Sequence, residues 1–210
     1  LWVTESGQKR LEGIWDEASH TEITIVDKNV MERLLPDGAV HQGIAVAVEP
    51  LQETFLGDIL NAERLPNPKP QLVVVLDEVT DPHNVGAVMR SMAMFGAKAL
   101  IVHKYNAPTV TGALAKTATG AVEHVPMIVV TNLATALKEM QMAGFYILGL
   151  DENATVKLTD VPRDRSIALV LGAEGEGLRE KTRSACDAIA AIPSFGPIAS
   201  LNVSNAAAIA

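Results

Sequence analysis

Short apolar runs alternate with amphipathic segments along most of the chain. The apolar runs predict strands that are buried on both faces, and they lie at residues 72–76, 99–102, 127–130, 145–150, 166–171 and 187–192. Apolar residues at helical spacing separate several of these runs and predict helices, at residues 84–95, 111–119 and 133–142. Such alternation is typical of an α/β domain with a mainly parallel sheet.

The first fifty residues predict a separate, smaller α/β piece. Its elements are two strands and a short helix that ends at a turn signal, at residues 22–26, 43–48, 28–35 and 36–38. A further helix is predicted at residues 53–64, and the prolines at 66, 68 and 70 are typical of an extended linker. We therefore predict a first domain at residues 1–50, a linker at residues 51–70 and a second domain at residues 71–210.

The composition indicates a globular protein with an acidic balance of charge. The net charge of −8 argues against broad electrostatic binding of nucleic acid, although it leaves room for a local basic patch. No apolar run reaches the length of a membrane helix. The single cysteine, Cys186, excludes an intrachain disulfide and suggests a reducing compartment. We therefore expect a cytoplasmic protein, and we expect no metal site because the five histidines lack paired helical spacing.

Polar residues gather where three predicted strands end, and the first of these clusters spans residues 77–90. Ligands of parallel α/β sheets bind at the carboxyl ends of strands. Asn84 is a favoured N-cap for the helix that follows, Gly86 permits close approach of the backbone, and Arg90 offers a fork of donors for a phosphate or a carboxylate. The alternative for Arg90 is a solvated side chain on an amphipathic helix.

The second cluster, residues 172–177, has a glycine-rich sequence that superficially suggests a dinucleotide site. The required third glycine would fall at position 180, which is Glu180, and Glu174 and Glu176 would repel a pyrophosphate. The loop is better suited to a neutral or cationic ligand, and a sulfonium cation fits that description. The alternative is an ordinary glycine-rich turn.

The third cluster joins the last predicted strand to a helix that is rich in alanine. The chain turns through Pro193, Gly196 and Pro197, and polar residues then occupy the joint, at Ser200, Asn202, Ser204 and Asn205. Serine and asparagine are favoured N-caps, and a helix N-terminus suits a polar or anionic ligand. A capped helix after a loop, with no further role, is the alternative.

Together the three clusters resemble the three motifs of the SpoU (TrmH-type) branch of the SPOUT RNA 2′-O-ribose methyltransferases. The resemblance covers residues 72–210, and the matching residues are Asn84, Gly86 and Arg90, then Gly172, Glu174, Gly175 and Gly177, and finally Ile192, Pro193, Gly196, Ser200, Leu201, Asn202, Val203 and Ser204. Ser194 stands where the family often has methionine. The N-terminal piece, with His41-Gln42-Gly43, is similar to the L30e-like RNA-binding domain of the ribosomal RNA members, and we expect the first part of that domain to be missing from it.

The resemblance implies a SPOUT fold in which the C-terminal segment forms a trefoil knot, and a homodimer whose subunits share each active site. It implies S-adenosylmethionine as the cofactor, bound near Gly172, Ile192 and Leu201, with Glu174, Gly175, Gly177 and Gly196 as further cofactor-binding candidates. It implies Asn84, Arg90, Glu174, Ser200 and Asn202 as catalytic residues. Small and apolar side chains suit the dimer face, at residues 202–210 and at Ala87, Met89, Met92, Ala93 and Met94.

The implied reaction is methyl transfer to a ribose 2′-OH, with a guanosine of 23S ribosomal RNA as the expected target and transfer RNA as the alternative. Arginine keeps its proton in proteins, so we interpret Arg90 as a stabiliser of the developing alkoxide and a phosphate anchor. The group that accepts the proton stays open. Two other hypotheses are a non-catalytic RNA-binding module and a nucleotide-dependent oxidoreductase, and the absent third glycine argues against the second.

Overall fold

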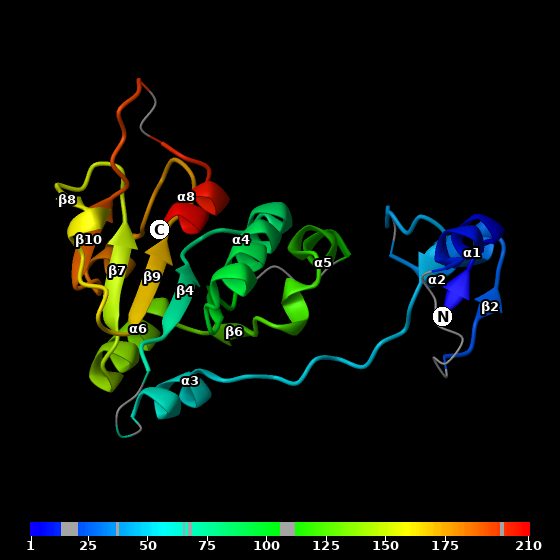
Figure 1. Cartoon of the computed structure of the whole chain (residues 1–210), viewed down its shortest axis with the longest axis horizontal. Coiled ribbons are helices and arrows are strands. Elements are labelled where there is room, and N and C mark those ends of the chain that lie inside the picture. The colour runs from blue at the N-terminus through cyan, green and yellow to red at the C-terminus, as the bar shows by residue number, and fades with distance from the viewer. Residues whose placement is uncertain (14–20, 37, 65, 67–68, 106–111, 198–199) are drawn as a thin grey trace. The chain divides into compact units, whose positions relative to one another are not determined.

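The computed structural model describes residues 1–13, 21–36, 38–64, 66, 69–105, 112–197 and 200–210. Parts of four predicted features lie outside the described residues: residue 37 of the turn, residues 65, 67 and 68 of the proline-rich stretch, residue 111 of the helix predicted at 111–119, and residues 198–199 of the third polar cluster. The chain forms two compact units, Leu1–Leu51 and Gln52–Ala210. Each unit has its own sheet (Figure 1).

The first unit is a three-stranded sheet with two helices. Its strands lie in the order β2-β1-β3, where β1 is parallel to β2 and antiparallel to β3. The elements are β1 (Trp2–Val3), α1 (Glu5–Leu11), β2 (Thr24–Ile25), α2 (Lys28–Leu34) and β3 (Ile44–Ala45). Val3, Met31 and Ala45 form its buried apolar core. Both predicted strands are shorter than expected because β1, which the pattern did not predict, offers only two residues for pairing.

The second unit contains a seven-stranded sheet in the order β6-β5-β4-β9-β7-β10-β8. Every neighbouring pair is parallel, which confirms the predicted α/β architecture. Its strands are β4 (Leu72–Leu76), β5 (Leu100–His103), β6 (Met127–Val130), β7 (Tyr146–Leu150), β8 (Val156–Lys157), β9 (Ile167–Leu171) and β10 (Ala188–Ala191). The strand order does not trace how the C-terminal segment threads, so the trefoil knot stays a prediction.

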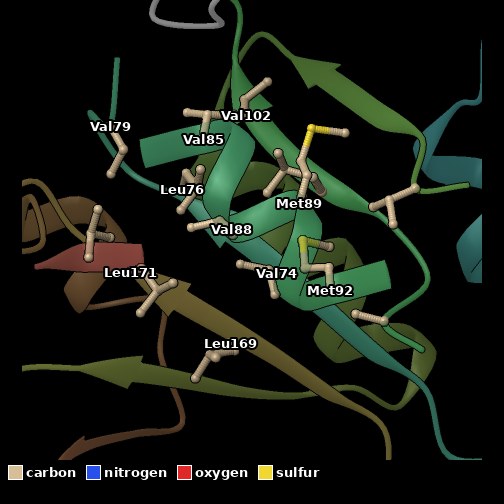
Figure 2. Packing of buried hydrophobic residues seen from close by; sticks show 14 of the residues in the cluster. Val74, Leu76, Val79, Val85, Val88, Met89, Met92, Val102, Leu169 and Leu171 are labelled. Carbon is tan, nitrogen blue, oxygen red and sulfur yellow. The ribbon is translucent and has the colours of Figure 1, made fainter. Parts of the chain in front are cut away.

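Helices cover both faces of this sheet, because its central strands are apolar on both sides. Val74 and Leu76 of β4 belong to one buried cluster, whereas Val73 and Val75 belong to the other. Figure 2 shows the first cluster, in which Val85, Val88, Met89 and Met92 of α4 lie over β4 and its neighbours. The helices on that side are α4 (Pro82–Phe95), α5 (Gly112–Ala118) and α8 (Val203–Ile209). On the other side lie α3 (Leu56–Glu63) and α6 (Leu133–Ala143).

Short one-turn elements complete the unit. They are α7 (Glu180–Arg183) and two 3₁₀ helices, Ala121–Glu123 and Leu158–Asp160.

The expected linker at residues 51–70 is in part a structural element of the second unit. Ile59 and Leu60 of α3 are buried in the cluster that α6 covers. Glu63, at the end of α3, accepts hydrogen bonds from Gln71 Nε2 and Ser166 Oγ, at 3.0 and 2.6 Å. This helix is therefore packed against the sheet, which corrects its assignment to a linker. An amphipathic helix can pack on a sheet even when the sequence that follows it is rich in proline.

Candidate active site

Three polar clusters meet at one edge of the seven-stranded sheet because all of its strands run in the same direction. β4 and β9 are hydrogen-bonded neighbours, and β7 separates β9 from β10. The clusters that follow Leu76, Leu171 and Ile192 therefore emerge at the same edge, as expected for carboxyl ends of parallel strands.

The first cluster forms the start of α4, but Asn84 is not its N-cap. Asp81 caps the helix by accepting a hydrogen bond from the backbone N–H of His83 at 3.1 Å, and Pro82 occupies the first turn. Proline is favoured there because its missing N–H would be unpaired in any case. The helix thus begins two residues earlier than predicted. Asn84 lies inside the first turn, and its side chain is free to bond elsewhere.

Gly86 allows α4 to pack closely on α5, so the close backbone approach expected at this glycine is to another helix. A Cβ atom at this position would lie 2.8 Å from the carbonyl oxygen of Leu114 and 2.9 Å from Cβ of Thr117. These distances are shorter than van der Waals contact, so any larger residue would push the two helices apart.

Asn84, Glu174 and Asn202 form one hydrogen-bonded cluster, which joins all three motifs. Oε1 of Glu174 accepts from Nδ2 of Asn202 at 2.7 Å and from Nδ2 of Asn84 at 3.4 Å. Nδ2 of Asn202 also donates to Oδ1 of Asn84 at 3.0 Å. The backbone N–H of Val203, the first residue of α8, lies 3.4 Å from the same Glu174 oxygen. A carboxylate thus orients two amide side chains that are far apart in sequence.

Asn202 has a second task as the N-cap of α8. Its Oδ1 accepts from the backbone N–H of Ser204 at 2.9 Å and from the Ser204 hydroxyl at 2.5 Å. The cap that the sequence predicted at this joint is therefore present. Because one end of the amide holds the helix and the other holds Glu174, the start of α8 is tied to the site.

A cavity of about 190 Å³ lies next to this cluster. The described residues that line it lie at or beyond the ends of three strands, β7, β9 and β10. They include seven of the predicted cofactor-binding or catalytic residues: Gly172, Glu174, Gly175, Gly177, Ile192, Ser200 and Leu201. Gly196 is not among the described lining residues; it lies in the exposed segment Ser194–Pro197, and its part in cofactor binding stays a prediction.

Sequence reasoning missed one wall of the cavity, formed by Asp151, Glu152 and Asn153 after β7. The available signal was the same as for the other clusters: three polar residues directly follow an apolar strand. Val203 and Ala206 of α8 close another side.

The glycine-rich loop at residues 172–177 has a backbone that larger residues could not adopt. A Cβ on Gly172 would lie only 2.2 Å from the carbonyl carbon of Gly177. Gly175 and Gly177 have φ values of 84° and 70°, in the left-handed region that glycine reaches without strain. The backbone N–H of Gly177 donates to the carbonyl of Ala173 at 2.9 Å and closes the loop.

The cavity is acidic. Four carboxylates line it, from Asp151, Glu152, Glu174 and Glu176, and none of the described lining residues is basic. The guanidinium of Arg183 lowers the pKa of Asp151, and the backbone N–H of Asn153 adds to this effect. Asp151 therefore stays ionised at neutral pH, and the cavity favours a ligand with positive charge.

Arg90 is the one predicted catalytic residue that the structure does not join to the others. Its side chain is exposed on α4, and it makes no hydrogen bond or ion pair with any other residue in the described ranges. Its guanidinium is therefore available to an external anion.

Three further features were examined among the described residues: the single cysteine, clusters of metal-ligating side chains, and long apolar helices. Burial raises the pKa of the Cys186 thiol to about 12, so this residue is not a thiolate nucleophile. Within the described ranges there is no group of three or more His, Cys, Asp or Glu residues that could hold a metal ion. In the same part of the chain, no helix is long and apolar enough to cross a membrane.

Comparison with known proteins identifies the family of this chain. Residues 71–210 match the model of the SpoU rRNA Methylase family. The chain is 36% identical, over 100% of its length and 84% of the relative, to the 23S rRNA (guanosine-2′-O-)-methyltransferase RlmB of Pseudomonas syringae pv. tomato. It is 40% identical to the protein of the same name from Pasteurella multocida, over 96% of this chain and 82% of that one.

Solved structures show the same fold. The SpoU methyltransferase AviRb from Streptomyces viridochromogenes superposes with a TM-score of 0.75 at 24% identity, over 99% of this chain and 77% of that chain. A second AviRb structure, in complex with the cofactor AdoMet, has a TM-score of 0.70 at 23% identity, over 99% of this chain and 79% of that chain. The family match over two thirds of the chain, together with these relatives, establishes that the chain belongs to the SpoU rRNA methylase family.

Proposed function

We propose that this protein transfers a methyl group from S-adenosylmethionine to a ribose 2′-OH of ribosomal RNA. The observation that carries the proposal is the Asn84–Glu174–Asn202 cluster, which lies beside an acidic, glycine-walled cavity. Relatives of this chain are named 23S rRNA (guanosine-2′-O-)-methyltransferases, and the chain spans more than four fifths of the first two. A guanosine of 23S ribosomal RNA is therefore the proposed target.

The cavity residues fit the proposed cofactor. Gly172 lets the two ends of the glycine-rich loop come together to form one wall, Ile192 and Leu201 offer apolar surface, and the carboxylates suit the positive charge of a sulfonium. When bound, S-adenosylmethionine supplies an electrophilic methyl group. The residues of this chain hold it, exclude water and orient the RNA ribose.

Arg90 is proposed to act on the ribose and its phosphate. Arginine remains protonated at any ordinary pH, so its role is to anchor a phosphate and to stabilise negative charge that develops on the 2′ oxygen. Its exposure and its lack of partners among the described residues are consistent with that role. Glu174 and Asn202 fix the loop and the start of α8, which places Ser200 at the cavity.

The first unit is proposed to bind the RNA substrate. Lys9 and Arg10 are exposed in the last turn of α1, and Arg10 donates to the carbonyl of Gln42 at 3.2 Å. Gly43 lies against α1, since a Cβ on Gly7 would clash with its carbonyl. The His41–Gly43 segment is thus held beside a local pair of cations, as an RNA contact would require.

The proposed enzyme should bind S-adenosylmethionine and not NAD. Because the cavity is acidic, it should also bind the neutral product S-adenosylhomocysteine at least about fivefold more weakly, the effect of one unit charge at about 4 Å in water. Sinefungin, in which an amine replaces the sulfonium, should bind like the cofactor. Calorimetry measures the three affinities.

The double variant Glu152→Gln with Glu176→Gln should reduce the ratio of the two affinities, that for the cationic S-adenosylmethionine over that for the neutral S-adenosylhomocysteine. Glu139→Gln, on the exposed side of α6, serves as the control and should leave it unchanged. Tight binding of NAD without binding of the methyl donor would contradict the proposed function, and equal affinity for cofactor and product would contradict the electrostatic argument.

We also propose a homodimer that uses exposed apolar residues of α4 and α8. Met94 and Ile209 are 81% and 58% exposed. Met89 and Met92, which the sequence placed on this face, are buried in the core of their own chain and leave the proposed interface. Ala206 and Ala207 also pack partly against that core.

Met94→Glu combined with Ile209→Glu is expected to give a monomer that retains its secondary structure and loses methylation, because the interface would bury unpaired charges. Light scattering and a methylation assay measure the two effects. Met142→Glu is the matched control: Met142 is a 79% exposed methionine on α6, which covers the opposite face of the sheet. A wild type that is monomeric and fully active at assay concentration would refute both the dimer and the shared site, and a monomeric double variant with full activity would refute the shared site.

A further inference from the structure

Asp77 is a completely buried carboxylate directly after β4, and its exposed fraction is 0%. A buried charge is tolerated only when it is paired and hydrogen-bonded. Arg179 provides both: its backbone N–H donates to Oδ2 at 2.9 Å, and its Nε donates to Oδ1 at 2.7 Å. A terminal guanidinium nitrogen of Arg179 lies 2.7 Å from the same Oδ1.

The contacts of Asp77 reach both ends of the glycine-rich loop. Its backbone N–H donates to the carbonyl of Leu171 at 2.8 Å, immediately before Gly172. Its side chain holds Arg179, two residues after Gly177. A single residue at the start of the first motif therefore joins the entry and the exit of the loop that forms one wall of the cavity.

Glu78 extends this arrangement. Its Oε1 lies 2.5 Å from the other terminal nitrogen of Arg179, so two consecutive carboxylates hold one guanidinium. The backbone of Glu78 has a φ of 65°, a left-handed conformation that is unfavourable for a residue with a side chain. The conformation directs consecutive side chains to the same partner.

We propose that Asp77 and Arg179 are positioning residues for the proposed methyl transfer. They hold the loop at residues 172–177 in the shape that receives S-adenosylmethionine, and they hold Glu174 within hydrogen-bond reach of Asn84. The inference rests on the proposed function, because it assigns the loop to the cofactor. Neither residue lines the cavity, so both act through the loop.

A role confined to general stability is the competing explanation. β4 and β9 are already paired at five positions, from Leu72 with Ile167 to Leu76 with Leu171. The Asp77–Arg179 contact lies beyond the last of these pairs. Its loss should therefore release the loop more than the strands, and the two explanations predict different patterns of hydrogen exchange.

Arg179→Met and Arg179→Lys test the proposal in the full chain. For the Met variant we expect the Kd of S-adenosylmethionine to rise about tenfold or more, as small misplacements in a site produce. The backbone amides of residues 173–178 should exchange faster without ligand, while those of β4 and β9 stay protected. Arg179→Lys keeps the charge but loses the planar fork, so it should give a smaller change in the same direction.

Arg165→Met is the control, since Arg165 is also a half-exposed arginine in an ion pair, and it lies two residues before β9, at the end of the strand away from the cavity. It should leave Kd and loop exchange unchanged. Wild-type affinity in both Arg179 variants would overturn the proposal, and so would faster exchange throughout β4 and β9. If the wild type failed to bind S-adenosylmethionine, the proposed function would be refuted. Hydrogen exchange of the loop amides, measured without ligand, would still decide whether Arg179 holds the loop.

Discussion

Arg90→Ala is expected to reduce methylation of ribosomal RNA at least about a hundredfold, the scale of losing one transition-state donor. Arg90 is exposed on α4 and has no hydrogen-bond or ion-pair partner among the described residues. Its removal therefore leaves the packing of the helix intact, and the thermal unfolding temperature should stay near that of the wild type. Transfer of a labelled methyl group, measured as kcat/KM, reports the loss.

Arg90→Lys should fail nearly as severely, because an ammonium retains the charge but cannot present two parallel donors. Arg163→Ala, at an exposed position before β9, is the matched control and should retain full activity. Near-normal turnover of Arg90→Ala would refute the proposed role. Strong loss in Arg163→Ala would indicate a general electrostatic effect on RNA binding instead.

Glu174→Ala should also reduce methylation by about a hundredfold, the loss seen when an oriented polar group is removed from a site. One oxygen of Glu174 holds Asn84, Asn202 and the N–H of Val203. Without it the two amides lose their common acceptor, and the loop is no longer tied to the start of α8. The assay is methyl transfer at saturating cofactor, so that weaker cofactor binding does not account for the result.

Glu174→Gln separates hydrogen bonding from charge. Its amide oxygen can replace the single accepting oxygen of Glu174, so we expect the cluster to form and activity to fall less than in Glu174→Ala. Glu139→Ala, on α6, is a control that should be fully active. Wild-type rates in Glu174→Ala would show that the cluster is dispensable.

Local pattern was most informative where the chain is buried on both sides. The apolar runs at residues 72–76 and 127–130 match β4 and β6 in both bounds, because a continuous run of β-branched residues suits few other structures. The helix predicted at residues 133–142 is α6, which its amphipathic spacing indicated, and Gly144 ends it in a left-handed conformation. Two-residue strands such as β1 and β8 have no period to detect, and the pattern missed both.

Competing local signals explain the other differences. Asn84 and Asp81 are both good caps, and Pro82 decides in favour of Asp81. Proline-rich sequence beside residues 53–64 suggested a linker, yet Ile59 and Leu60 bury their side chains against the sheet. In each case the local pattern offered two structures, and a further feature decided between them: a proline in the first turn of α4, and burial of apolar side chains of α3 against the sheet.

The sequence by itself determined which chemical groups are present: a guanidinium at Arg90, carboxylates in a glycine-rich loop, and capping amides before the last helix. Only the tertiary structure decided which of them meet. Asn84 and Asn202 are 118 residues apart and bond directly, and Asp77 holds Arg179 across 102 residues. Hydrophobic periodicity reports which side of an element is buried, whereas these contacts depend on the order of the strands, which places β4 beside β9 and brings the carboxyl ends of β7 and β10 to the same edge.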